Sequence, residues 1–399
     1  MRIGIDYTSA VHQGAGIGRY TRQLIKTLLE LDTQNEYTLV MAGDVLLSRA
    51  QSFSEPVSES SLTTVHSFSL APANYPHVRM VRLPLSERLL AVLWHRLHVP
   101  LWIEFFSGAL DVFHSPDFAL PPVRKARTMV TVHDLSFLRV PQCSHPKLRA
   151  YLCQVVPSSV RRANVVLADS ECTKADVIEL LGVESDRVWV IYAGVGQEFQ
   201  RIEDERKLEA VRVRYRLPAR FVLGLGTLQP RKNFERLIEA YAQVRRDLNY
   251  ELQLVIAGAL GWMYEGIFEK VKALGLQDTV YFPGYVADGD LPALYSMADL
   301  FVFPSLYEGF GLPPLEAMAC GTPVITSNVS ALPEVVGHAA WMVDPCDSEA
   351  LAEAMKQVLS DLALRNQMVS RGLTQARRFT WSQAAEKLLA VYQHVASVL

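Results

Sequence analysis

Two adjacent cations, Arg231 and Lys232, stand between an apolar run and a helix-like segment in GLGTLQPRKN, residues 224–233. The guanidinium group of arginine offers a planar fork of donors to phosphate oxygens, and lysine adds a mobile point charge. The N-terminus of the following helix adds a partial positive charge at the same place. Such a pair is often only a solvated loop, but its position at the carboxyl end of a strand favours a diphosphate-binding site.

Two carboxylates, Glu308 and Glu316, flank a segment rich in glycine and proline, EGFGLPPLE. Pro313 and Pro314 suit the first turn of a helix, which places Glu308 in a loop. Glu316 is then expected in the first helical turns. Backbone N–H groups between the glutamates can hold an anion, and each carboxylate can accept hydrogen bonds from sugar hydroxyls. The segment is therefore typical of a sugar-nucleotide site; in the alternative, Glu316 only complements the helix dipole and Glu308 is solvated.

A second glycine cluster, GAGIGRY at residues 14–20, lies between the first apolar run and a helix-like pattern. A G-x-G-x-x-G motif would need glycine at the position of Arg19, and Asp44 comes too late to bind a ribose in the way that motif requires. This weakens the interpretation as a nicotinamide site. Small residues still let a phosphate or sugar approach the helix N-terminus, and a flexible turn is the alternative.

His133 ends the apolar run TMVTVHD, at a predicted carboxyl strand end. That position favours a role in the cleft over a purely structural histidine. His114 ends another strand and is the weaker candidate. The sequence has no His/Cys cluster with ligand spacing and no D-x-D run, so no metal site is expected.

The composition excludes several classes of protein. The 399 residues include 39 basic and 42 acidic side chains, a formal net charge of -3, so a nucleic-acid partner is not expected. Half of the residues are hydrophobic and a fifth are charged, which excludes global disorder. The five cysteines form no C-x-x-C pair, which predicts a reduced, cytoplasmic chain without disulfides.

Secretory and membrane-spanning segments are not expected. Asp6 interrupts the first apolar run, which predicts a core strand and not a signal peptide. The most apolar stretch, residues 89–106, is interrupted by charged and histidine side chains and cannot span a bilayer. The wider segment Arg79–Phe106 mixes arginines with large apolar residues. It predicts a core-facing helix or, alternatively, an interfacial helix at the inner face of an anionic membrane.

Strand and helix patterns alternate along the whole chain. Apolar runs predict strands at residues 2–6, 36–42, 111–115, 128–134, 164–170 and 187–194, and again at 221–226, 251–258, 279–284, 299–305 and 322–327. Several are continuously apolar, as expected of parallel strands covered on both faces. The fold class is therefore α/β, with two doubly wound Rossmann-like domains that face a central cleft. The charge-dense residues 201–220 mark the boundary, which predicts an N-terminal domain over 1–200 and a C-terminal domain over 201–379.

Taken together, these motifs resemble the retaining glycosyltransferases of family 4, which have the GT-B fold. The resemblance covers nearly the whole chain and rests on GAGIGRY at 14–20, HSPD at 114–117, VTVHD at 130–134, ADS-x-x-T at 168–173, LGTLQPRKN at 225–233, PGYV at 283–286 and EGFGLPPLE at 308–316. The last of these matches the family's pair of glutamates separated by seven residues. The sequence looks most like the branch of bacterial mannosyltransferases that use GDP-mannose in polysaccharide assembly.

The resemblance implies a role for each matched residue. The catalytic group would be His133 beside the transferred sugar, Arg231 and Lys232 at the diphosphate, and Glu308 at the donor sugar. The donor would further contact Gly16 near the diphosphate, the backbone amides of Phe310, Gly311 and Leu312, Glu316 at the ribose hydroxyls, and Tyr285 and Val286, after Gly284, at the base. The N-terminal domain would bind the acceptor, and the final helix, residues 380–399, would pack back onto it. Neither a metal nor another cofactor is implied.

The implied reaction moves a hexose, mannose from GDP-mannose, to a saccharide or lipid-linked saccharide acceptor. No carboxylate is an obvious nucleophile, which favours attack on the face of the leaving diphosphate. The alternatives are a glycosyltransferase that uses a UDP-sugar, a UDP-sugar epimerase or phosphorylase with the same fold, a nicotinamide-dependent oxidoreductase, and an inactive sugar-nucleotide sensor. The broken glycine motif speaks against the oxidoreductase, and no lysine context suggests the pyridoxal phosphate that a phosphorylase needs.

Overall fold

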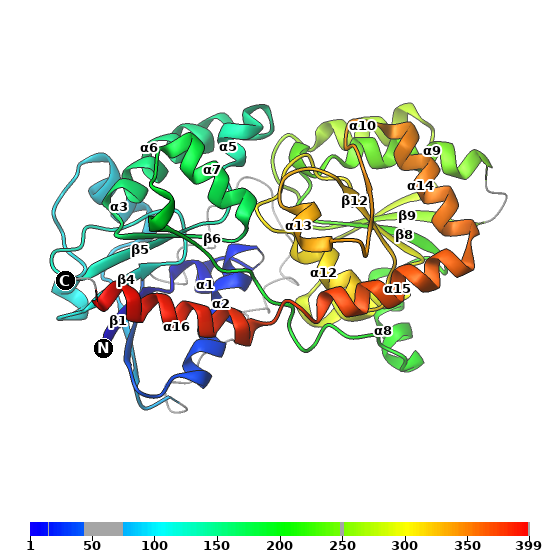
Figure 1. Cartoon of the computed structure of the whole chain (residues 1–399). Helices are drawn as coiled ribbons and strands as arrows, with labels where there is room; N and C mark the ends of the chain where they lie inside the picture. The colour runs from blue at the N-terminus through cyan, green and yellow to red at the C-terminus, as the bar shows by residue number, and fades with distance from the viewer. Residues whose placement is uncertain (15, 44–74, 248–250, 398–399) are drawn as a thin grey trace.

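The computed structural model describes residues 1–14, 16–43, 75–247 and 251–397, and its strands form two separate parallel sheets (Figure 1). The first sheet has the order β3-β2-β1-β4-β5-β6-β7 and the second the order β10-β9-β8-β11-β12-β13. The strands of the first are β1 (Arg2–Asp6), β2 (Glu36–Met41), β3 (Val78–Arg82), β4 (Val112–Ser115), β5 (Arg127–Val132), β6 (Val165–Ala168) and β7 (Val188–Val190). Those of the second are β8 (Phe221–Leu225), β9 (Gln253–Ala257), β10 (Val280–Gly284), β11 (Leu300–Phe303), β12 (Val324–Ser327) and β13 (Trp341–Val343). The predicted α/β class with two doubly wound sheets is confirmed.

Helices connect the strands and cover both faces of each sheet (Figure 1). The first half contains α1 (Thr8–His12), α2 (Ile17–Leu31), α3 (Glu87–Ala91), the π-helical turn η4 (Val92–Arg96), α4 (Glu104–Ser107), α5 (Ser136–Arg139), η5 (Pro141–Cys143), α6 (Pro146–Arg162), α7 (Glu171–Leu181) and η6 (Ser185–Arg187). The second half contains α8 (Glu205–Tyr215), η7 (Pro230–Lys232), α9 (Phe234–Asp247), α10 (Glu265–Ala273), η8 (Asp288–Asp290), α11 (Leu291–Met297), α12 (Leu312–Ala319), α13 (Leu332–Val336), α14 (Ser348–Ser360), α15 (Leu362–Ala376) and α16 (Trp381–Ser397). Residues 398–399 of the predicted last helix lie outside the described residues.

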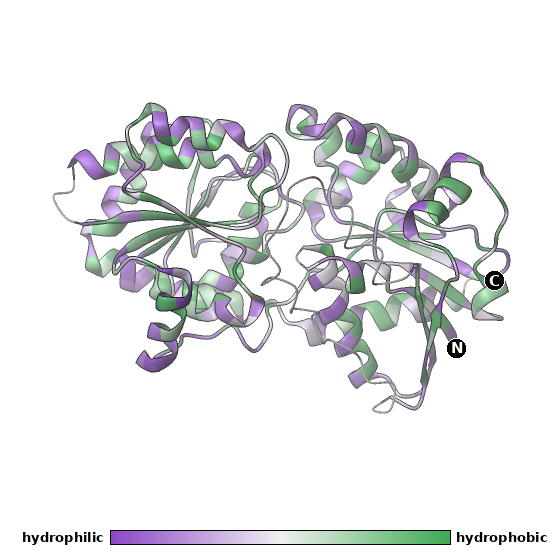
Figure 2. Ribbon diagram, turned by 180° about the vertical axis from the view of Figure 1, so that it is seen from behind, coloured by the Kyte–Doolittle hydropathy of each residue, from purple (hydrophilic) through white to green (hydrophobic). Residues whose placement is uncertain are grey.

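The distribution of apolar side chains explains this layering. Every residue of β11 and β12 is buried, as expected of central parallel strands. The helix α2 buries Tyr20, Leu24 and Leu28, which recur every four residues on one face. Accordingly, the strands are the hydrophobic part of each domain, and hydrophilic residues lie mainly on the outer helix faces (Figure 2).

The chain crosses between the domains twice, and the two crossings lie side by side (Figure 1). Val195 pairs with Thr380 in a short parallel bridge, and its N–H donates to the carbonyl oxygen of Phe379 at 3.0 Å. After the second crossing, α16 packs along α2 of the first domain. The hydroxyl oxygen of Tyr392 in α16 lies 2.8 Å from Nδ1 of His114, and both side chains are buried. His114 is therefore a residue of the core and not of the cleft.

The segment Arg79–Phe106 does not form the single helix that was expected. The segment begins in the edge strand β3, continues in α3 and η4, and ends in α4. Pro84 and Pro100 lie within it, and proline interrupts helical hydrogen bonding. Leu97 and Phe105 are 61% and 63% exposed, and membrane contact stays a prediction. Within the described ranges, no helix combines the length and the apolarity that a bilayer crossing requires.

Two strands were not predicted, and both lie at sheet edges. The edge strand β3 has the sequence VRMVR and is only half-buried, so it lacks the continuous apolar pattern of the central strands. The other, β13, has three residues, Trp341–Val343. An element this short carries too few residues for a period to be recognised.

The first crossing predicts a sensitive position at Gly194. A Cβ atom there would lie 2.2 Å from the backbone nitrogen of Trp381, so an alanine would push the two crossing segments apart. We expect Gly194→Ala to lower the free energy of unfolding, measured by denaturant titration, by about 1–3 kcal/mol. Gly289→Ala serves as the control, because a Cβ atom at Gly289 would meet nothing within 4 Å. Equal stability of the two variants would contradict the prediction.

Candidate active site

A cleft of about 620 Å³ lies between the two domains, at the carboxyl ends of strands from both sheets. Its volume is in the range of pockets that bind small-molecule ligands. It is lined by Gly16, Arg19, Tyr20, His133, Asp134 and Asp169 of the first domain and by Arg231, Lys232, Tyr285, Val286, Glu308, Phe310, Gly311 and Leu312 of the second, among others. All the predicted site residues are in its lining except Gly284 and Glu316. Gly284 ends β10 directly before Tyr285, and Glu316 is paired with Arg19.

Glu308 joins the two predicted cations into one buried cluster. Its carboxylate oxygens lie 2.7 Å from Nη1 of Arg231 and 2.6 Å from Nζ of Lys232. Burial opposes the negative charge, but the two cations hold the pKa of Glu308 at about 2. The cluster therefore contains two positive charges and one negative charge, and it has an excess of positive charge at the cleft.

The turn before α9 positions both cations. Asn233 ends η7 with a φ of 57°, a left-handed conformation that asparagine adopts more readily than most residues. Its side-chain nitrogen donates to the carbonyl oxygens of Pro304 at 3.0 Å and Pro345 at 2.7 Å. These bonds tie the turn that carries Arg231 and Lys232 to the loop after β11, where Glu308 lies.

The glycine-rich segment after Glu308 leads into α12, as the sequence predicts. Gly311 precedes the helix with a φ of 126°, which side-chain-bearing residues rarely adopt. Pro313 lies in the first helical turn, and no side chain caps the helix. The first N–H groups of a helix have no partner within it and carry partial positive charge. Leu312, the first residue of α12, lines the cleft, so an anion there would meet this end of the helix.

Both ring nitrogens of His133 have partners in the protein. Nδ1 lies 2.7 Å from Oδ2 of Asp169, and Nε2 lies 2.9 Å from the carbonyl oxygen of Pro116. Both partners are acceptors, so both nitrogens donate and the ring is an imidazolium ion. Burial opposes this charge, but Asp169 raises the pKa of His133 to about 9. The predicted catalytic histidine is thus a buried cation with no lone pair to receive a proton.

The residue after Glu308 holds the two domains in contact. The hydroxyls of Ser170 and Thr173 donate to the carbonyl oxygen of Gly309, at 2.7 Å and 3.2 Å. A Cβ atom on Gly309 would lie 1.8 Å from the carbonyl oxygen of His133, so no side chain fits there. The ADS-x-x-T segment of the first domain therefore binds the EGFG loop of the second domain.

Further contacts join the domains around the cleft. Glu334 of α13 accepts hydrogen bonds from the backbone N–H groups of Glu171 at 2.9 Å and Cys172 at 3.3 Å. A carboxylate at the N-terminus of α7 is favoured by the partial positive charge there. Nε1 of Trp262 donates to the carbonyl oxygen of Cys143 at 2.8 Å. The cleft is consequently bounded by direct bonds between the domains.

Arg19, which the sequence indicates only as the residue that breaks a glycine motif, pairs with Glu316 across the domains. It forms an ion pair and hydrogen bond with Oε1 of Glu316, and the hydroxyl of Tyr295 donates to Oε2 at 3.0 Å. Burial raises the pKa of Glu316, and Arg19 opposes that rise. Asp169, the partner of His133, was also not predicted as a site residue, although it lies in the ADS-x-x-T segment. In both cases the residue lies in a recognised motif, but its partner is far away in the sequence.

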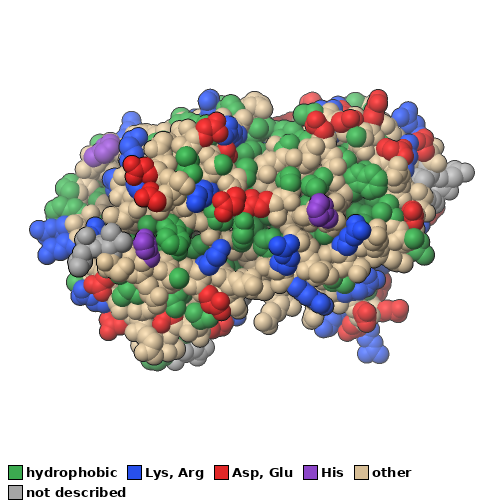
Figure 3. All heavy atoms as spheres, viewed as in Figure 1, with side chains coloured by type: hydrophobic (Ala, Val, Ile, Leu, Met, Phe, Trp, Pro, Cys, Tyr) green, Lys and Arg blue, Asp and Glu red, His purple; other side chains and the backbone are tan. Residues whose placement is uncertain are grey.

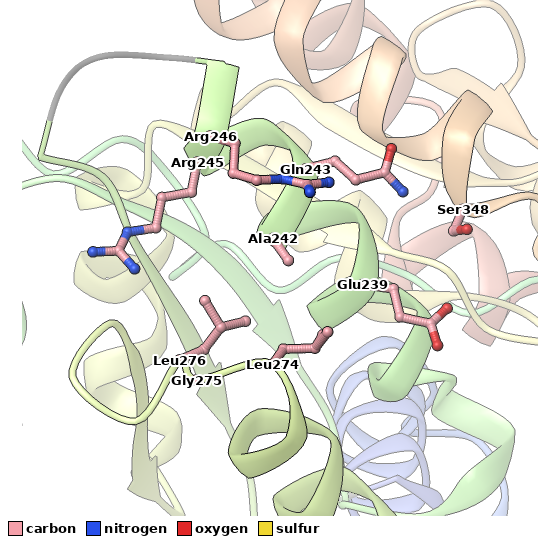
Figure 4. A pocket seen from close by; sticks show the side chains of 9 residues that line it. All are labelled: Glu239, Ala242, Gln243, Arg245, Arg246, Leu274, Gly275, Leu276 and Ser348. Atoms are coloured by element: carbon pink, nitrogen blue, oxygen red, sulfur yellow. The ribbon is translucent and has the colours of Figure 1, made fainter.

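In a separate hollow on the C-terminal domain, charged side chains do not point toward one another as they do in the cleft (Figure 4). It is lined by Glu239, Ala242, Gln243, Arg245, Arg246, Leu274, Gly275, Leu276 and Ser348. Arg245 and Glu239 extend toward opposite ends of it (Figure 4), and Glu239 is already paired with Lys270 at 2.5 Å. None of the predicted site residues lines this hollow, so the interdomain cleft is the candidate site.

The distribution of charge over the surface agrees with the near-equal numbers of acidic and basic residues. Acidic and basic side chains are interspersed over both domains on the face in Figure 3, without a large field of one sign. Across the described part of the chain, no group of three or more His, Cys, Asp or Glu side chains is placed to hold a metal ion. All five cysteines are free.

Two family models match this chain, one in each half of the sequence. A family model described as "Glycosyltransferase Family 4" matches residues 14–199, and one described as "Glycosyl transferases group 1" matches residues 209–375. The chain is 31% identical over 381 residues to O-antigen chain mannosyltransferase B of Escherichia coli, with 95% of this chain and 96% of that protein covered. It is 30% identical over 383 residues to the serotype-specific mannosyltransferase WbdA of Escherichia coli, with 93% of this chain but 45% of WbdA covered.

Solved structures share the fold over nearly the whole chain. Sucrose-phosphate synthase from Thermosynechococcus elongatus has a TM-score of 0.75 at 22% identity, with 100% of both chains covered. WaaG, a glycosyltransferase involved in lipopolysaccharide biosynthesis, has a TM-score of 0.70 at 17% identity, with 98% of this chain and 99% of WaaG covered. Anabaena Alr3699/HepE, solved with UDP-glucose, has a TM-score of 0.69 at 19% identity, with 99% and 100% covered. The predicted GT-B architecture is thereby confirmed.

The pairing of His133 with Asp169 predicts a loss of stability at alkaline pH. Because the pKa of His133 is raised to about 9 in the folded chain, the pair stabilises fully below about 6.5 and is lost as the pH rises through about 9. Between about pH 7 and 10 we expect the free energy of unfolding to fall by about 1.5–3 kcal/mol more in the wild type than in Asp169→Asn. Denaturant titrations across this range measure the difference.

Asp186→Asn is the matched control for that experiment, because Asp186 is an exposed carboxylate in η6. It is expected to follow the wild type at every pH. If Asp169→Asn followed the wild type as well, His133 would not hold its charge through Asp169.

Proposed function

We propose that this chain, which belongs to the family 4 glycosyltransferases with the GT-B fold, transfers mannose from GDP-mannose to a saccharide or lipid-linked saccharide with retention of configuration. The observation that carries the proposal is the buried cluster of Glu308, Arg231 and Lys232 in the interdomain cleft. The two Escherichia coli mannosyltransferases support mannose as the sugar, and one of them matches along nearly its whole length. The other is about twice as long, so its whole activity is not carried over.

The cluster suits the departure of a nucleoside diphosphate. When the bond between the anomeric carbon and the phosphate oxygen breaks, negative charge develops on the diphosphate. Arg231, Lys232 and the N–H groups at the start of α12 border the same cleft and stabilise that charge. In this proposal the protein's own cations offset part of the charge on the leaving group, and no cofactor takes part.

The same cluster argues against Glu308 as a nucleophile. Its two oxygens face Arg231 and Lys232, which hold its pKa at about 2 and weaken its basicity. The acceptor hydroxyl instead attacks the anomeric carbon on the face that the diphosphate leaves. The carbon–phosphate oxygen bond breaks as the bond to the acceptor oxygen forms, and the hydroxyl proton passes to a phosphate oxygen. The products are a glycoside with retained configuration and the nucleoside diphosphate.

His133 contributes charge and not proton transfer in this scheme. Its ring is held as an imidazolium ion between Asp169 and the carbonyl oxygen of Pro116. A group with both nitrogens donating cannot remove the proton of the acceptor hydroxyl. The carbonyl oxygen of His133 contacts Gly309, so the residue also fixes the EGFG loop that follows Glu308.

A thermal-shift panel tests the donor. We expect GDP-mannose and GDP to raise the melting temperature by several degrees, because a ligand that binds only the folded state stabilises it in proportion to its concentration and affinity. UDP-glucose, UDP-N-acetylglucosamine and NAD are the comparison ligands. If only UDP-sugars stabilised the chain, the donor would be a UDP-sugar and not GDP-mannose. A change in the sugar of the nucleotide without any acceptor would indicate an epimerase.

Replacement of Arg231 tests the role of the cluster. We expect Arg231→Ala to lower kcat by about 10²–10³-fold, because a preorganised cation that faces developing charge is lost. Steady-state transfer with the donor that the panel identifies measures the effect. Arg245→Ala removes the same charge in the hollow of Figure 4 and is expected to keep the wild-type kcat. Near-normal turnover of Arg231→Ala would rule out its action on the leaving group.

A further inference from the structure

Both carboxylate oxygens of Glu316 have partners within the protein. Arg19 pairs with Oε1, and the hydroxyl of Tyr295 donates to Oε2 at 3.0 Å. The side chain of Glu316 is only 2% exposed and that of Arg19 only 15%. The resemblance to family 4 implies that Glu316 binds the ribose hydroxyls of the donor. Because so little of its side chain is exposed, the ribose can reach the carboxylate only when one of these partners moves.

Arg19 is the partner that can leave. Tyr295 belongs to α11 of the same domain as Glu316 and is fully buried in its core. Arg19 comes from the other domain, on the first turn of α2, and lines the cleft. Its remaining contacts are weak, since a carboxylate oxygen of Asp288 is 4.0 Å away and the ring centroid of Phe199 is 5.7 Å away. A long, flexible arginine side chain held mainly by one ion pair can therefore move once that pair is replaced.

The charges at the opposite side of the cleft show where a free arginine would be needed. Glu308 offsets one of the two cations Arg231 and Lys232. Asp134 also lines the cleft and acts electrostatically on Arg231, which reduces the positive excess further. A sugar nucleotide carries two negative charges on its diphosphate, so this cluster leaves at least one of them without a counter-charge. An unbalanced charge in a site with little water is costly.

Arg19 lines the same cleft as that cluster. It follows Gly16 by three residues, and Gly16 forms the N-terminal boundary of α2 with a φ of 56°. Residues three apart on a helix share a face, so the side chain of Arg19 projects from the same end of α2 that borders the cleft. Gly16, Arg19 and Gly311 all line one cavity.

We propose that Arg19 is an exchangeable donor-binding residue: it occupies the ribose site on Glu316 while the cleft is empty, and it moves to the diphosphate when ribose takes its place. This inference rests on the proposed function, because it needs a nucleotide in the cleft. It predicts that the phosphates of the donor interact with a cation of the N-terminal domain only after the ribose has displaced it. Arg19 then completes the charge balance that Arg231 and Lys232 leave open.

The exchange makes opposite predictions for ligands with and without phosphate. Isothermal titration compares GDP with guanosine, and UDP with uridine, on the wild type and on Arg19→Gln. For the base that binds, we expect Arg19→Gln to weaken the nucleoside diphosphate by about 10–100-fold, since charge-assisted bonds to phosphate are lost. The nucleoside should bind no more weakly than to the wild type, because Glu316 no longer exchanges one partner for another. The ratio of the two affinities is the readout.

Two further variants keep the test decisive. Arg19→Lys retains the charge without the planar fork and is expected to restore part of the diphosphate affinity, which also covers the case in which Arg19→Gln folds poorly. Lys26→Gln removes one positive charge from α2 at a surface pair with Glu30 and should leave both affinities unchanged.

Other outcomes overturn the exchange. Equal weakening of nucleoside and nucleoside diphosphate would mean that Arg19 only supports the shape of the site. Tighter binding of both would make it a competitor for Glu316 that never reaches the phosphates. Unchanged affinities in Arg19→Gln would mean that Arg19 does not take part in donor binding, and the proposed function would still stand. A wild type that binds none of the four ligands would contradict the proposed function itself.

Discussion

The carboxylate of Glu308 lies between Arg231 and Lys232, at 2.7 Å and 2.6 Å, and is largely hidden from solvent. Without it, two adjacent cations would repel each other in a poorly solvated place, and burial of either one alone would be costly. With it, the cluster keeps a positive excess on the side of the cleft. The left-handed Asn233, the short turn η7 and the glycine loop before α12 all serve to bring these three side chains together.

The position of that cluster is linked to the arrangement of the domains. Gly309 follows Glu308 and packs so closely on His133 that a side chain has no room, while Ser170 and Thr173 bind its carbonyl oxygen. Any opening of the cleft therefore pulls on the loop that carries Glu308. The two crossings run side by side at Val195, and α16 returns to the first domain, so two segments of the chain connect the domains. The loop that carries Glu308 is consequently also part of the contact between the domains.

The features that could be predicted are those determined by residues close together in the sequence. Apolar runs separated by helical segments give the doubly wound sheets, and the prolines after Gly311 give the start of α12 where it was expected. The edge strand β3 was not predicted because two arginines interrupt its short apolar run, and the expected helix over Arg79–Phe106 is broken at its prolines. The pairing of Arg19 with Glu316 spans 297 positions of sequence and depends on how the two domains meet. No local period contains that information.

Three of the carboxylates at the cleft are paired with cations of the protein itself. Glu308 is paired with two cations, Asp169 with His133, and Glu316 with Arg19. A charged ligand that binds to these groups therefore replaces one set of ion pairs with another. Such an exchange lowers the net gain on binding, because existing pairs are broken, but it also keeps the empty site stable. Under the proposed exchange, Glu316 and Arg19 would pair again as the nucleoside diphosphate departs, which would favour product release.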